Sequence, residues 1–74
     1  MPKGYPLSRT QNLDSTTREA KRVLLQTRDW DKTKTHLNYW IRGQWGFSRM
    51  TINDYMGGAA ARLMKDAETK ELLK

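Results

Sequence analysis

Residues 38–45 read NYWIRGQW and residues 46–56 read GFSRMTINDYM, and these two adjoining stretches decide the fold. Gly46 suits a tight turn, because glycine adopts a positive φ angle at little steric cost. Two residues later, Ser48 offers the hydroxyl that commonly accepts a hydrogen bond at the start of a helix. The stretch therefore predicts one helix that ends at Gly46 and a second that begins just after Ser48.

The apolar residues around this turn have the spacing that two packed helices require. Trp45 and Phe47 flank the glycine and are predicted to be largely buried in the angle between the helices. Ile52 and Tyr55 lie three residues apart, so they share the inner face of the second helix. The outward-facing residues are then Ser48, Arg49, Met50, Asn53 and Asp54.

The remainder of the chain predicts more helices and no strand. A first helix is expected from about residue 14, with Thr16 and Glu19 at the spacing of a capping box. The helix before the turn is expected to be capped by Asp31 or Thr33. Gly57-Gly58 is expected to interrupt the helix after the turn, and residues 59–74 to form a fourth helix. These features predict an all-α bundle of three to four helices.

The N-terminal residues 1–13, MPKGYPLSRTQNL, differ in composition from the rest of the chain. They contain both prolines, one glycine and two basic residues, and no acidic residue. This composition disfavours a helix and predicts a flexible basic arm ahead of a helical domain at residues 14–74. Two interpretations of the arm stay open: it lies in a groove of DNA, or it is a disordered terminus.

Composition narrows the classes of function. The chain has 74 residues, which fits one small domain, and a formal net charge of +6 with a pI near 10.0. It has no cysteine, so disulfides and thiolate metal sites are excluded. It has no apolar run long enough for a membrane span or a signal peptide, which favours the cytoplasm. The basic charge indicates a nucleic-acid partner, with a merely soluble basic domain as the alternative.

Residues 35–57 resemble the helix-turn-helix of DNA-binding proteins of the repressor and resolvase kind. These proteins often have glycine, an apolar residue, serine, two variable residues, threonine and an aliphatic residue in this order. One position departs from the pattern: four residues before the turn glycine the family has a small residue, where this chain has Arg42. The adjacent Gly43 weakens the helix by about 1 kcal/mol relative to alanine, which indicates that a backbone approaches closely there.

The resemblance implies a role for each exposed residue. The second helix would lie in the major groove of DNA. There Arg49 would pair with guanine, Asn53 with adenine and Met50 with a thymine methyl group, while Asp54 would accept from cytosine or repel phosphate. The residues implied for phosphate contact are Ser48, Thr51, Lys32, Lys34, Thr35 and Arg42. The alternative for each is a solvated helix face.

An enzyme is not expected. His36 is the one histidine, and no partner for serine hydrolysis or for a metal accompanies it. The sequence thus predicts a small sequence-specific protein that binds double-stranded DNA and regulates transcription in a phage, plasmid or mobile element. It would act as a homodimer, through residues 59–74, and without a cofactor. Two alternatives stay open: a DNA-architectural or recombination accessory factor resembling an excisionase, and a small inhibitor of a host enzyme.

Overall fold

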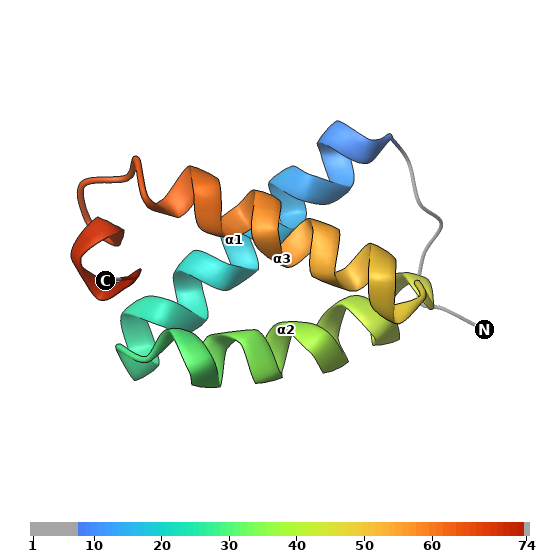
Figure 1. Ribbon diagram of the computed structural model, residues 1–74, viewed down its shortest axis with the longest axis horizontal. Helices are drawn as coiled ribbons and strands as arrows, with labels where there is room; N and C mark the ends of the chain where they lie inside the picture. Colours follow the sequence, from blue (N-terminus) through green and yellow to red (C-terminus); the bar gives the residue numbers. More distant parts are fainter. Residues whose placement is uncertain (1–7, 74) are drawn as a thin grey trace.

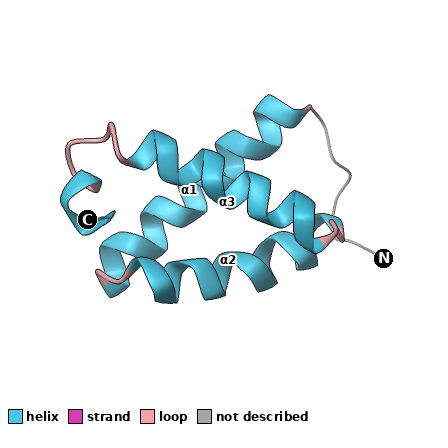
Figure 2. Ribbon diagram, viewed as in Figure 1, coloured by secondary structure: helices cyan, strands magenta, loops and turns pink. Residues whose placement is uncertain are grey.

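The computed structural model describes residues 8–73, and every regular element among them is helical (Figures 1 and 2). The elements are α1 (Arg9–Thr27), α2 (Trp30–Trp45), α3 (Arg49–Leu63) and a short 3-10 helix, η1 (Lys70–Leu73). The predicted all-α bundle is therefore confirmed, with three α-helices. The proposed arm lies partly outside the described residues, which begin at Ser8.

The three α-helices enclose one apolar core. Helices α2 and α3 meet at the Gly46 turn and diverge away from it, and α1 lies behind both and packs against both (Figure 1). The core consists of Ala20, Leu24, Leu37, Ile41, Ile52, Tyr55, Ala59 and Leu63. Ile52 and Tyr55 thus occupy the inner face of α3 that the sequence predicts.

The turn between α2 and α3 has the predicted local chemistry. Gly46 ends α2 in the left-handed conformation, with φ 68° and ψ 28°. Ser48 caps α3, and its hydroxyl accepts a hydrogen bond from the Thr51 amide at 3.4 Å. The predicted cap of α2 is wrong, because Asp29 takes that role and accepts hydrogen bonds from the amides of Asp31 and Lys32 at 2.9 and 3.2 Å.

The first helix begins five residues earlier than predicted. Ser8 and Gln11 form a reciprocal capping box, so residues 9–13 of the predicted arm are helical. The predicted cap at Thr16 is wrong. Thr16 is instead fully buried, and its hydroxyl donates to the Asn12 carbonyl at 2.9 Å.

The glycine pair does not interrupt α3, which runs to Leu63. A Cβ atom on Gly57 would meet nothing within 4 Å, whereas one on Gly58 would lie 2.8 Å from Leu13 Cδ1. Gly58 thus lets α1 and α3 approach closely. Helix α3 therefore continues through two glycines, although each destabilises a helix by about 1 kcal/mol relative to alanine.

This difference gives a matched pair of variants. Gly58→Val is expected to destabilise the protein by about 1–3 kcal/mol, because the new side chain overpacks against Leu13. Gly57→Val is expected to change stability by less than about 0.5 kcal/mol, because its position is open. Thermal melts followed by circular dichroism measure both variants. Equal losses for the two would contradict the packing of Leu13 on Gly58.

The predicted fourth helix over residues 59–74 is wrong. After Leu63 the chain turns, and Thr69, fully buried, donates its hydroxyl to the Leu63 carbonyl at 2.8 Å. Lys21 of α1 also holds this segment, through ion pairs with Asp66 at 3.0 Å and Glu68 at 2.9 Å. The hydrogen bonds that Lys21 donates to the carboxylates of Glu68 and Asp66 raise the pKa of Lys21.

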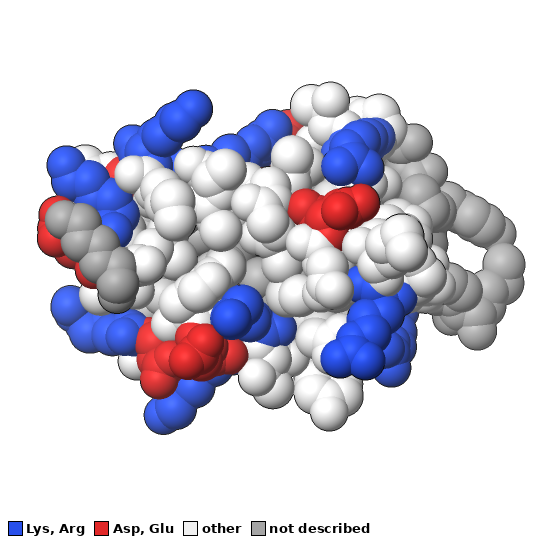
Figure 3. All heavy atoms as spheres, viewed as in Figure 1, with Lys and Arg blue, Asp and Glu red and all other residues white. Residues whose placement is uncertain are grey.

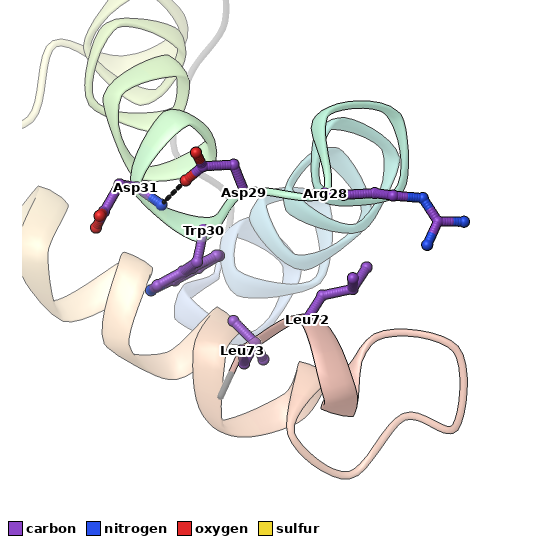
Figure 4. A pocket seen from close by; sticks show the side chains of 6 residues that line it. All are labelled: Arg28, Asp29, Trp30, Asp31, Leu72 and Leu73. Atoms are coloured by element: carbon purple, nitrogen blue, oxygen red, sulfur yellow. Dashed lines mark hydrogen bonds between the residues drawn. The ribbon is translucent and has the colours of Figure 1, made fainter.

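The C-terminal turn closes the corner between α1 and α2 (Figure 4). Leu72 and Leu73 line a hollow of about 370 Å³ together with Arg28, Asp29, Trp30 and Asp31. Asp29 is already engaged in capping α2 there. The hollow therefore lies where the end of α1, the start of α2 and the C-terminal turn meet, and Asp29 and the two leucines line it.

Trp45 and Phe47 at the turn pack against the core, and each is covered over most of its surface without being fully enclosed. They form one cluster with the buried Tyr55. The ring centroids of Trp45 and Phe47 are 5.4 Å apart, and those of Phe47 and Tyr55 are 5.3 Å apart with nearly parallel planes. Trp40 meets Trp45 edge-on at 5.5 Å. The turn that carries this cluster lies at one end of the molecule (Figure 1).

One polar network joins α1 to α2. The Glu19 carboxylate accepts two hydrogen bonds from Arg22, at 2.9 and 2.8 Å, and lies 2.7 Å from Nε2 of His36. The Glu19 side chain is 15% exposed. The hydrogen bonds from Arg22, opposed by burial and supported by His36, lower the pKa of Glu19 to about 2.

Across residues 8–73, no helix has both the length and the apolar character that a membrane crossing requires.

Candidate nucleic-acid interface

The outer face of α3 carries the side chains that the sequence predicts to read bases. Burial of Ile52 and Tyr55 fixes the rotation of the helix about its axis. Arg49, Asn53 and Asp54 are then exposed, as is Met50, whose exposed fraction is 77%. An α-helix with an exposed polar face at its first two turns is the element that enters the major groove in helix-turn-helix proteins.

A groove between α2 and α3 brings part of the predicted site together. Its volume is about 340 Å³, and it is lined by Lys34, Thr35, Asn38, Tyr39, Arg49, Asn53 and Met56. Two residues predicted to read bases, Arg49 and Asn53, therefore lie beside two predicted to contact phosphate, Lys34 and Thr35. The groove does not include the other predicted residues, which are Met50, Asp54, Ser48, Thr51, Lys32 and Arg42.

Several of the residues predicted for phosphate contact already have partners within the protein. Ser48 caps α3, and its Oγ lies 3.1 Å from the hydroxyl of Thr51. Lys34 forms an ion pair with Asp31 at 3.2 Å. Thr35 donates its hydroxyl to the Asp31 carbonyl at 3.1 Å. Because Lys34 and Asp31 are both well exposed, their ion pair is weak and exchangeable.

The arginines near the turn are different, because neither Arg42 nor Arg49 has an acidic partner within the described part of the chain. By contrast, Lys21, Arg22 and Arg62 each pair with a carboxylate. On the face shown in Figure 3, lysine and arginine side chains lie mostly around the rim and acidic side chains lie among them. The α2–α3 groove is therefore distinguished by the side chains that line it, and not by a continuous basic surface around it.

Arg42 stands where the helix-turn-helix family has a small residue, and it is exposed rather than packed between the helices. The expectation of a close backbone approach at Gly43 is wrong within residues 8–73, because a Cβ atom there would meet nothing within 4 Å. Gly43 instead contributes to a surface notch of about 270 Å³, together with Tyr39, Trp40 and Gln44. Tyr39 lines both this notch and the groove, so the two surfaces adjoin.

No family model matches the chain, and neither a curated protein nor a solved structure is significantly similar to it. The geometry of these surfaces therefore carries the functional argument alone.

The predicted site lacks three residues of the groove, which are Asn38, Tyr39 and Met56. Asn38 lies four residues after Lys34 and four before Arg42, which places all three in one row along α2. Met56 lies three residues after Asn53 on α3 in the same way. This helical spacing is the signal that points to Asn38 and Met56. The groove offers guanidinium, ammonium and amide donors and no carboxylate, a set of side chains suited to an anionic partner.

Proposed function

We propose that this protein binds double-stranded DNA with α3 and reads its sequence through Arg49 and Asn53. The observation that supports the proposal is the groove that gathers these two side chains with Lys34 and Thr35, beside an arginine-bearing turn. A guanidinium group can pair with both acceptors on the major-groove edge of guanine, and a carboxamide can pair with adenine. Transcriptional regulation in the cytoplasm, in a phage, plasmid or mobile element, is the use we propose.

The remaining predicted residues supply the rest of the contact. Met50 extends far enough from α3 to meet a thymine methyl group, and Asp54 accepts from cytosine or repels phosphate. Lys32, Lys34, Thr35 and Arg42 on α2, with Ser48 and Thr51 at the start of α3, would contact phosphates. Such contacts hold the protein in register on the duplex and add no sequence information.

A single small helical unit makes few base contacts, so we propose that two copies bind a paired site. Residues 59–74 are the proposed contact between the copies. In this segment Met64 is 57% exposed, which makes it the apolar side chain available for such a contact.

The test starts by selecting a preferred sequence from random duplexes with the wild-type protein. Arg49→Ala is then expected to lose about 1–3 kcal/mol of binding free energy on the selected duplex and to relax preference at one base pair. Arg49→Lys keeps the charge but loses the two-pronged geometry, so it should lose sequence preference while keeping most of its affinity for scrambled duplexes. Titrations at two salt concentrations measure both effects.

Arg18→Ala is the matched control, because Arg18 is exposed on α1, lies outside the groove and outside residues 59–74, and its replacement removes the same charge. It is expected to leave sequence preference unchanged. Equal small losses for the Arg49 and Arg18 variants on every duplex would reduce the interaction to nonspecific charge. Absence of binding by the wild-type protein to any duplex would overturn the proposal.

A further inference from the structure

Gly43 has no structural reason within the described residues to be a glycine. It lies inside α2, where glycine destabilises a helix relative to alanine. Its φ angle is not positive, since Gly46 is the positive-φ glycine of the structure, and a Cβ atom on Gly43 would meet nothing within 4 Å. The space above Gly43 is therefore open to something outside the protein.

The surroundings of Gly43 describe what would fit this space. Tyr39 lies one helical turn earlier and is 69% exposed, and Trp40 and Gln44 complete the notch. Arg42, exposed and without a carboxylate partner in residues 8–73, lies three residues after Tyr39 and so on the same side of α2. The notch itself is thus lined by two aromatic side chains and an amide, and Arg42 is the neighbour of Gly43 in the sequence.

We infer that the sugar–phosphate backbone of one DNA strand crosses α2 at Gly43, with a deoxyribose in the notch and a phosphate at Arg42. This inference rests on the proposed function and extends it to a second surface. The charges of α2 favour this occupant: its one carboxylate, Asp31, lies in the first turn, away from the notch. Tyr39 joins the notch to the groove of Arg49 and Asn53, so a strand leaving the groove has a continuous path.

Gly43→Leu tests the inference directly, because it fills the notch without meeting any other group at its Cβ. The variant is expected to melt at or above the wild-type temperature and to bind every duplex about tenfold more weakly. The loss should be the same on the selected and scrambled duplexes, because backbone contacts carry no sequence information. Arg42→Ala is expected to lower the slope of log affinity against log salt by about one unit.

Gln26→Leu is the control, because it adds a side chain of the same kind to an exposed position in the last turn of α1, outside the notch, the groove and residues 59–74. It is expected to bind DNA as the wild-type protein does. Wild-type affinity in Gly43→Leu, with Arg49→Ala still losing sequence preference, would overturn this inference and leave the proposed function standing. A change of oligomeric state in Gly43→Leu without DNA, seen by sedimentation, would also overturn it, because the notch would then be a contact between copies.

Discussion

Replacing Ile52 with alanine is expected to remove about 2–5 kcal/mol of the free energy of unfolding. Ile52 is fully buried between α3 and the rest of the core, so the truncated side chain leaves a cavity. A domain of this length has a total stability of only about 4–11 kcal/mol. The melting temperature should therefore fall by at least about 10 °C. If the total stability is near about 4 kcal/mol, the largest expected loss leaves the variant largely unfolded at room temperature.

Met50→Ala is the matched control for Ile52→Ala. Met50 lies two residues earlier in α3 and carries a side chain of similar size, but it is 77% exposed. Its replacement should change stability by no more than about 0.5 kcal/mol. Urea titrations of the three proteins give the comparison. Similar losses for the two variants would mean that α3 is rotated about its axis from the orientation described here.

The second large effect concerns acid stability through Glu19. Its pKa is about 2 in the folded protein, against 4.5 for an unperturbed glutamate. A lowered pKa stabilises the folded state above the unfolded value, and this contribution disappears as the pH falls through the folded value. The wild-type protein should therefore lose about 2–3 kcal/mol between pH 5 and pH 2 on account of Glu19 alone.

Glu19→Gln isolates this contribution, because glutamine keeps the shape of the side chain but cannot ionise. The variant is expected to be less stable than the wild-type protein by about 2–3 kcal/mol at pH 7, and the difference should vanish near pH 2. Glu68→Gln is the control. The Glu68 carboxylate forms an ion pair with Lys21, but its side chain is 65% exposed, so this variant should lose less than about 1 kcal/mol of stability. Denaturation curves recorded across this pH range would contradict the assignment if the Glu19→Gln and wild-type curves remained parallel.

The sequence predicts the turn between α2 and α3 well, because its determinants lie within a few residues of one another. Gly46 adopts the left-handed conformation and Ser48 caps α3, as their positions indicate. Ile52 and Tyr55 are buried at the predicted helical spacing. Gly46 acts through its own backbone and Ser48 through its own hydroxyl, so the ends of the two helices at this turn depend little on tertiary packing.

Among the wrong predictions, the end of the helix after the turn involves a contact between residues that are distant in the sequence, whereas the cap of α2 is decided locally by Asp29. Helix α3 continues through Gly58 because Leu13 packs on it, and no local pattern contains that contact. The start of α1 was different, because Ser8 and Gln11 do carry the capping-box signature. The prediction for residues 1–13 rests on their prolines, glycine and charge, and does not use that signature.

For the candidate site, the sequence predicts which side chains face outward but not which of them meet. Exposure of Arg49 and Asn53 follows from the inward positions of their neighbours. Their association with Lys34 and Asn38 depends on how α2 and α3 diverge from the turn, which periodicity does not specify. The extent to which Trp45 is covered is likewise not specified by periodicity, because it depends on the position of the turn in the whole molecule.

The contact between Arg9 and Tyr55 has a practical consequence for labelling and fusion. The Arg9 guanidinium lies 5.4 Å from the centre of the Tyr55 ring, which stacks on Phe47 at the turn. A label on Arg9 would therefore lie close to the proposed DNA-binding end, where it would obstruct a duplex. The chain leaves through Leu72 and Leu73 beside Trp30, at the opposite end of α2. A C-terminal fusion therefore leaves the α2–α3 groove open.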